Sequence, residues 1–200
     1  MNDLQASTGL AKEKMDTYEG VLRDIYTNNY GESFEDVSLA LSTIRSQIGP
    51  VVDHWDPSAL QDFTESAFAL RDTFGYDIQE SVRAASAMME HFGIDGNEAL
   101  SMIAKGAQNG LDFSGELLDS ISEYSVQFAK IGLDADDMFK IMQKGADTGA
   151  FNLDKIGDAV KEFSIRVVDG SETTKQGFKD IGLNADEMAA KFAAGGDTAR

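Results

Sequence analysis

The sequence contains no cysteine, two histidines and two prolines among its 200 residues. A chain without cysteine forms no disulfide and has no thiolate to serve as a nucleophile or metal ligand. The histidines, His54 and His91, stand in no HExxH or related pattern, and neither has a serine or carboxylate arranged as a catalytic partner. We therefore expect no catalytic residue, no cofactor-binding residue, no metal ligand and no enzymatic activity.

Long apolar runs and basic clusters are also missing. No run approaches the roughly 20 apolar residues that cross a bilayer, and the polar first residues do not form a signal peptide. Lys and Arg number 17 against 35 Asp and Glu, a formal net charge of −18. Binding to phosphate backbones depends on arrays of Lys and Arg. The sequence thus predicts a soluble protein with no membrane segment and no direct nucleic-acid binding.

Clusters of glycine and aspartate lack the order that ligand sites need. No GxxxxGK[ST] or GxGxxG loop is present, so we interpret the glycines at 106, 110, 145 and 149 as close-packing points and helix C-caps. The acidic cluster Asp134, Asp136 and Asp137 lacks the mid-loop glycine and terminal glutamate of an EF-hand. Helix capping is the interpretation that we prefer, because carboxylates in a first turn complement the positive helix end.

The histidines and methionines also have structural interpretations. His91 is predicted near a helix C-terminus, where the dipole favours an imidazolium, and His54 is predicted to form a loop pair with Trp55. Core filling is the main interpretation of the methionines, with a groove for partner helices as the alternative. Those at helical spacing include Met88, Met89, Met102, Met138 and Met142.

Helical periodicity dominates what is present. The hydrophobic fraction of 42% and charged fraction of 26% are typical of a chain that folds. Gly49 and Pro50 predict a helix stop, whereas Asp56 before Pro57 predicts an N-cap with proline in the first turn. The predicted helices occupy residues 3–28, 34–48, 57–73, 77–91, 96–108, 115–129, 135–147, 153–166, 172–180 and 185–193. Only residues 165–168 have a strand-like composition, so we predict an all-α fold.

An internal repeat is the strongest signal. Residues 93–128 align without a gap with residues 132–167, an offset of 39. The pairs include Gly93 with Gly132, Asp95 with Asp134, Gly106 with Gly145, and Gly110 with Gly149. Asp95 with Glu98, and Asn184 with Glu187, have the spacing of a capping box. We predict an array of short capped helices built from helix-hairpin repeats of about 39 residues.

A third copy begins at residues 182–188 (GLNADEM), which echo residues 132–138 (GLDADDM) after about 11 extra residues. Later, residues 195–198 (GGDT) echo residues 145–148 (GADT). We expect an N-terminal helical segment at 1–49 and a helical repeat region at 50–200, with a truncated third unit at 182–200. A repeat cut in half leaves an unburied helix face, so we expect this chain to be a fragment of a longer one.

These stretches resemble the phage tail tape-measure protein family, in its helical core region. The likeness covers most of the chain as a pattern of caps and apolar positions. It is carried by residues 30–37 (YGESFEDV), 92–95 (FGID), 103–106 (IAKG), 149–152 (GAFN), 158–163 (DAVKEF) and 182–188 (GLNADEM).

The resemblance implies a structural protein of a phage or prophage tail that acts in tail assembly and tail length determination inside the tail tube. It implies tail tube subunits, tail assembly chaperones and tail-tip proteins as partners, together with self-association. The implied locations are the virion tail and, during assembly, the bacterial host cytoplasm. The alternative from the residues alone is an acidic helical adaptor or scaffold that binds partner helices.

Overall fold

The computed structural model describes residues 12–199, and every regular element in that range is a helix. The α-helices are α2 (Lys12–Thr27), α3 (Phe34–Ile48), α4 (Pro57–Phe74), α5 (Ile78–Phe92), α6 (Gly96–Gln108), α7 (Leu117–Lys130), α8 (Ala135–Asp147), α9 (Leu153–Arg166), α10 (Glu172–Asp180), α11 (Ala185–Ala194) and α12 (Gly196–Ala199). A 3-10 helix, η1, runs from Pro50 to His54. The predicted all-α fold is confirmed.

Most helix boundaries lie at or near the predicted residues, and the exceptions are short. Residues 50–54 form η1 where a helix stop alone was predicted, so His54 ends a 3-10 helix instead of lying in a loop. Residues 165 and 166 complete α9 and form no strand. Of the predicted first helix, residues 3–11 lie outside the described residues.

Side-chain caps explain these boundaries. The Asp134 carboxylate accepts a bond from the Asp137 N–H at 2.8 Å, and the Asp137 carboxylate accepts the Asp134 N–H in return. Asp95 and Asn184 accept the N–H groups of Glu98 and Glu187, at 2.8 and 3.0 Å. The capping interpretation of Asp134 and Asp137 is therefore confirmed.

The predicted cap at Asp56 is only half right. Asp56 occupies the N-cap position of α4, but its side chain makes no capping hydrogen bond. Pro57 at the first helical position has no N–H to satisfy, and its restricted φ already suits a helix. Pro57 therefore favours the start of α4, whereas the Asp56 side chain contributes no capping bond.

The chain forms two compact units, each with its own set of contacts. Unit 1 comprises the described residues up to 89 together with 94–105, and unit 2 comprises residues 90–93 and those from 106 onward. The predicted division into 1–49 and 50–200 concerns sequence similarity, not spatial contacts, and stays a prediction.

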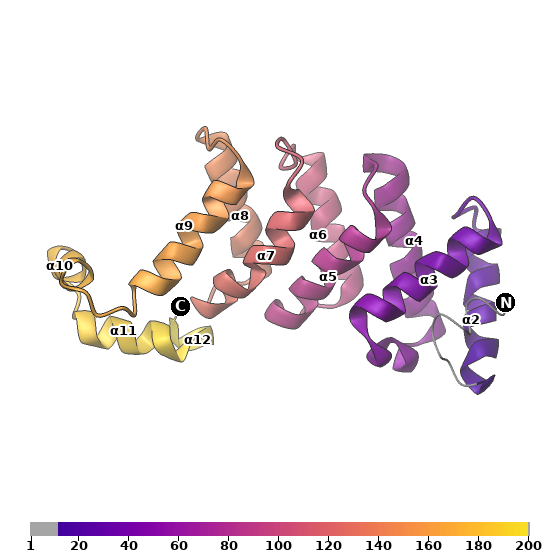
Figure 1. Ribbon diagram of the computed structural model, residues 1–200, viewed down its shortest axis with the longest axis horizontal. Coiled ribbons are helices and arrows are strands. Elements are labelled where there is room, and N and C mark those ends of the chain that lie inside the picture. Colours follow the sequence, from indigo (N-terminus) through magenta and orange to yellow (C-terminus); the bar gives the residue numbers. More distant parts are fainter. Residues whose placement is uncertain (1–11, 200) are drawn as a thin grey trace. The chain divides into compact units, whose positions relative to one another are not determined.

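In unit 1, α2 packs on both α3 and α4 (Figure 1). Its core contains aromatic and branched side chains with little or no exposure, among them Tyr18, Ile25, Leu41, Phe63 and Phe68. Trp55, just after η1, meets the Phe63 ring edge-on, with centroids 5.4 Å apart. Trp55, which was predicted to pair with His54, thus anchors the segment between η1 and α4 on the core.

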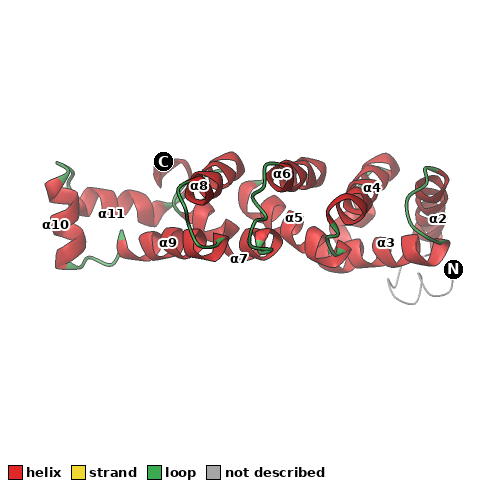
Figure 2. Cartoon of the chain, turned by 90° about the horizontal axis from the view of Figure 1, so that it is seen from above, coloured by secondary structure: helices red, strands yellow, loops and turns green. Residues whose placement is uncertain are grey.

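In unit 2, α7 and α9 lie side by side and α8 packs against both (Figures 1 and 2). The α10 and α11 helices form a second hairpin, and α12 returns to α7. The core of this unit is centred on Ile121, Tyr124, Phe128, Met138 and Met142, each at most 2% exposed.

The predicted roles of the repeat glycines are confirmed. A Cβ at Gly106 would lie 2.8 Å from Phe139 Cε1, and one at Gly145 would lie 2.5 Å from Ile156 Cδ1. Gly110 and Gly149 have φ angles of 76° and 92°, which suit glycine after a helix end. The α6 and α8 helices also begin and end at residues separated by the repeat offset of 39, as the alignment predicts. The α7 and α9 helices instead begin at Leu117 and Leu153, so the gapless alignment does not hold for the boundaries of the second helix of each unit.

Candidate functional site

A polar cluster around Asp53 joins three elements of unit 1. Arg45 on α3 makes a bidentate pair with the Asp53 carboxylate, with both N–O distances at 2.9 Å. The Tyr18 hydroxyl on α2 donates to the same carboxylate at 3.0 Å, and the Lys14 ammonium donates to the Asp53 carbonyl. The Asp53 side chain is only 14% exposed, so these bonds satisfy a largely buried charge.

The electrostatics of this cluster follow from its contacts. The hydrogen bonds from Arg45 hold the pKa of the Asp53 carboxyl below its usual value, against the effect of burial. Burial, assisted by the bond to Asp53, raises the pKa of the Tyr18 hydroxyl. The cluster favours an ionised Asp53 beside a neutral Tyr18. The two groups therefore form a structural bridge, because neither pKa is shifted toward neutrality as general acid–base catalysis requires.

A second polar cluster joins α7 to α9 in unit 2. The Tyr124 hydroxyl lies 2.6 Å from Asp154 Oδ1 and 3.1 Å from Asp158 Oδ1, and the Lys161 ammonium lies 5.9 Å from the Tyr124 ring centroid. Burial, followed by the bonds to the two carboxylates, raises the pKa of the Tyr124 hydroxyl. This arrangement also stabilises the neutral phenol and joins two helices.

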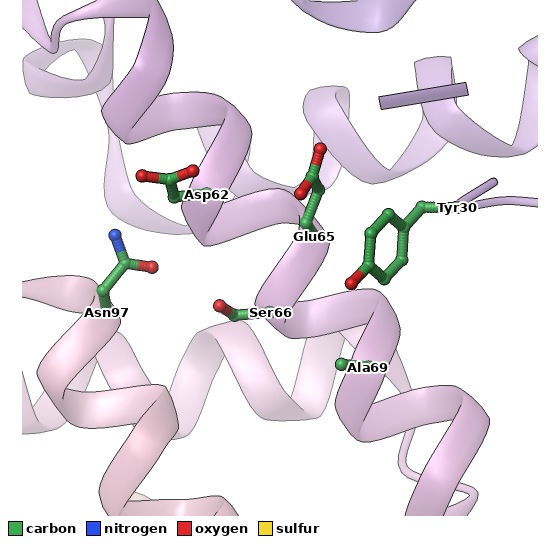
Figure 3. Close-up of a pocket in the computed structure, with 6 residues that line it drawn as sticks. All are labelled: Tyr30, Asp62, Glu65, Ser66, Ala69 and Asn97. Atoms are coloured by element: carbon green, nitrogen blue, oxygen red, sulfur yellow. The ribbon is translucent and has the colours of Figure 1, made fainter. Parts of the chain in front are cut away.

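Unit 1 has an open hollow of about 380 Å³, shown in Figure 3. It is lined by Tyr30, Asp62, Glu65, Ser66, Ala69 and Asn97. The Asn97 Oδ1 atom is buried without a hydrogen-bond partner, whereas Glu65 accepts bonds from Asn28 and Gln61 at 2.9 and 2.8 Å. The lining carries two carboxylates, Asp62 and Glu65, and no histidine.

The histidine and methionine residues that the sequence analysis considered occupy structural positions in the helices. His91 lies in the last turn of α5, as predicted. In the part of the chain that the structure describes, no group of three or more histidines or carboxylates is placed to hold a metal ion. Met88, Met138 and Met142 have no exposed surface, which confirms core filling for these three methionines.

Exposed apolar side chains of unit 2 form the feature that sequence analysis missed. Phe151 is 86% exposed and Ile181 is 70% exposed. Others in this unit are Phe113, Phe163, Ile165, Val168 and Leu183. Contiguous apolar patches mark contacts with other proteins, whereas single exposed apolar side chains are ordinary. No signal in the sequence marks this difference, because Ile181 matches Ile131 of the earlier copy, which is only 9% exposed.

The fold and its two polar clusters define a class of protein. It is an all-helical protein in which buried polar side chains join neighbouring helices and large apolar side chains are exposed. Within residues 12–199, no helix has both the length and the apolar character that crossing a membrane requires.

Residues 26–199 match the family described as phage-related minor tail protein. Because the match spans most of the chain, this protein belongs to that family. No curated protein and no solved structure matches the chain. Membership confirms the resemblance to a phage tail protein family and supports a structural role in the virion tail, with tail components as partners.

Proposed function

We propose that this chain is a structural segment of a tail tape-measure protein, acting in tail assembly and tail length determination inside the tail tube. The observation that carries the proposal is the family match over residues 26–199 of a chain built from repeated helical hairpins. Repetition supports a length function, because adding or removing a unit changes the size of a helical array without a new fold. The sequence analysis expects no catalytic residue, which accords with a structural role.

The partners in this proposal are tail tube subunits, tail assembly chaperones and tail-tip proteins, together with further copies of the chain. Assembly would take place in the host cytoplasm before the protein resides in the virion tail. The net charge of −18 supports passive coexistence with DNA in the same conduit, because like charges oppose adhesion. Tight DNA binding in a low-salt gel-shift assay would remove this part of the proposal.

The first test asks whether the protein is part of the tail. Mass spectrometry of purified virions and isolated tails is expected to detect peptides from residues 12–199. Tails that assemble normally and lack these peptides would contradict the structural role.

The second test addresses length determination separately. Residues 93–131 are duplicated in frame in the phage gene, and tail lengths are measured by electron microscopy. An α-helix rises about 1.5 Å per residue, so this insertion is expected to lengthen tails by at most about 60 Å. A flexible Gly/Ser insertion of equal residue number serves as the control. Tails of unchanged length would reject the ruler function while leaving a tail structural role intact.

The alternative is an acidic adaptor that holds partner helices in a methionine-rich groove. Its proposed groove is not supported by Met88, Met138 and Met142, because their side chains fill the cores. A regulatory genomic neighbourhood, without tail tube or tail-tip genes, would favour the adaptor over the tail protein.

A further inference from the structure

The end of α6 is closed by two backbone hydrogen bonds. The Gly110 N–H donates to the Ala107 carbonyl at 3.0 Å. The Leu111 N–H donates to the Gly106 carbonyl at 2.9 Å, and the Leu111 side chain is 1% exposed. This pair of bonds is a Schellman motif, with Gly110 as the glycine of positive φ that follows the helix. Asn109, the residue between the helix and this glycine, is therefore held in place by the closed turn.

The end of α8 has the same motif with a different residue before the glycine. The N–H groups of residues 149 and 150 make the two equivalent bonds, both at 3.0 Å. Thr148 occupies the position of Asn109 at the repeat offset of 39, and its hydroxyl donates to the Lys144 carbonyl at 2.8 Å. The motif therefore forms without asparagine at this position.

The Asn109 side chain is unlike the other asparagine side chains in its surroundings. It is exposed, and its amide makes no hydrogen bond with the described residues. In contrast, Asn28 donates to a glutamate, and Asn152 and Asn184 accept backbone N–H groups as helix caps. Asn109 is also the one asparagine of the sequence that precedes glycine, whereas each of the others precedes a larger residue.

An asparagine before glycine can react with its own backbone, because glycine has no Cβ to hinder the approach and bends freely. The Gly110 nitrogen attacks Cγ of Asn109. The N–Cγ bond forms, the Cγ–Nδ2 bond breaks, and ammonia leaves with the proton of the Gly110 amide. Water then opens the cyclic imide at either carbonyl. Opening at Cγ gives aspartate, and opening at the backbone carbonyl gives isoaspartate, in which the chain runs through Cγ. The sequence of steps consumes one water, releases one ammonia and needs no oxidant.

We propose that Asn109 is a site of spontaneous deamidation, and that the reaction opens the end of α6. In the closed turn the Gly110 N–H is bonded to Ala107, so the attack takes place when the turn opens, as helix ends do readily. The reaction involves only unit 2 and water, so it is independent of the role in the tail.

Both products oppose closing of the turn. Isoaspartate adds one carbon to the backbone before Gly110, so the two bonds of the motif no longer form together with Leu111 in the core. Aspartate leaves the backbone unchanged but places a carboxylate at the negative end of the helix dipole. Isoaspartate therefore has the larger effect.

The test uses the purified full chain, incubated at mildly alkaline pH and sampled over days. Alkaline pH speeds the attack because more of the backbone amide is deprotonated. Digestion in acid, followed by mass spectrometry, is expected to show residue 109 as the first asparagine to gain the mass of an amide-to-acid exchange. Electron-transfer fragmentation should detect both aspartate and isoaspartate there. The reaction should be slower in the folded chain than in the same chain unfolded in urea.

Asn109→Thr is the matched control, because it copies Thr148 of the second motif and leaves Gly110 unchanged. Urea unfolding followed by circular dichroism compares fresh and aged samples. The aged parent should have a lower urea midpoint than the fresh parent, whereas fresh and aged Asn109→Thr should agree. Asn109→Asp reproduces the aspartate product alone, and it should lower the midpoint less than ageing does.

Three results would overturn the proposal. The first is deamidation of another asparagine before Asn109, which would mean that the following glycine and the unbonded side chain do not select the site. The second is full conversion at residue 109 with an unchanged urea midpoint, which would mean that the end of α6 tolerates both products. The third is an equal rate in the folded and unfolded chains, which would mean that the turn does not restrain the Gly110 nitrogen.

Discussion

Gly157 on α9 lies directly beneath the ring of Tyr124 on α7. A Cβ at Gly157 would be 2.2 Å from Tyr124 Cδ2, closer than side-chain carbons approach one another. The ring is 2% exposed, and its hydroxyl reaches Asp154 and Asp158 on either side of the glycine. The bare backbone at this position therefore lets α7 and α9 meet in one register, with the hydroxyl bonded and the ring buried.

Gly157→Ala is expected to lower the free energy of unfolding of unit 2 by about 1–3 kcal/mol, the range for overpacking a filled core. Urea unfolding followed by circular dichroism measures the change. Gly177→Ala on α10 is the control, because a Cβ there meets nothing within 4 Å. That variant should instead gain about 0.5–1 kcal/mol from the helix preference of alanine. Equal effects of the two substitutions would contradict the close contact.

Asp134→Ala is expected to lower stability by about 1 kcal/mol, because it removes a side-chain N-cap and breaks a reciprocal capping box. Asp56→Ala is the matched control, since Asp56 occupies the same position on α4 without a capping hydrogen bond. Its effect should remain within about 0.5 kcal/mol. Thermal unfolding of both variants checks the difference, and a larger loss for Asp56→Ala would refute the assignment of the caps.

Asp53→Asn is expected to lower stability by about 2 kcal/mol at neutral pH, because hydrogen bonds to a charged and largely buried group are lost. The folded pKa of Asp53 is lowered, so its contribution is present above the unfolded pKa of about 3.9 and is lost as pH falls through the folded value. The difference between variant and parent should therefore shrink in strong acid.

Urea unfolding at several pH values between neutrality and strong acid measures this convergence. Arg45→Lys is the companion variant, because lysine retains the charge but not the bidentate geometry. It should lose less stability than Asp53→Asn. A difference for Asp53→Asn that is independent of pH would contradict the role of the carboxylate charge.

Alkaline pH is expected to destabilise both units through Tyr18 and Tyr124. Their folded pKa values are raised, so the neutral phenol is favoured in the folded state. This contribution is intact below the unfolded pKa of about 10 and is lost as pH rises toward the folded values. The melting temperature should fall above that pH, and less steeply in a Tyr18→Phe, Tyr124→Phe double variant. An equally steep fall in the double variant would disprove this origin.

Local signals were sufficient to predict most of the helices. The boundaries of α6 and α8 follow from Asp95, Asp134 and the apolar period, because a cap acts within one turn of its own residue. The 3-10 helix η1 was missed because its residues, 50–54, follow a stop signal and carry no helical period. Asp56 takes the predicted N-cap position without a capping hydrogen bond. Pro57 after it removes one of the four N–H groups that a helix start leaves unpaired.

The candidate sites could not be predicted in the same way. Nothing near Asp53 in the sequence indicates Tyr18, and nothing near Gly157 indicates Tyr124, because each pair comes from different helices. The hollow lined by Tyr30 and Asn97 likewise brings together separate elements. Such pairings depend on how helices pack, which periodicity does not specify.

The sequence by itself determined the helical class, the repeat, the caps and the net charge of −18, since each depends on residue identity or on neighbours within a few turns. Only the tertiary structure decided that Met138 is sealed while its repeat counterpart Met188 stays partly open. Both have the same local pattern. Burial depends on whether another helix covers that pattern, and α9 covers only one of them.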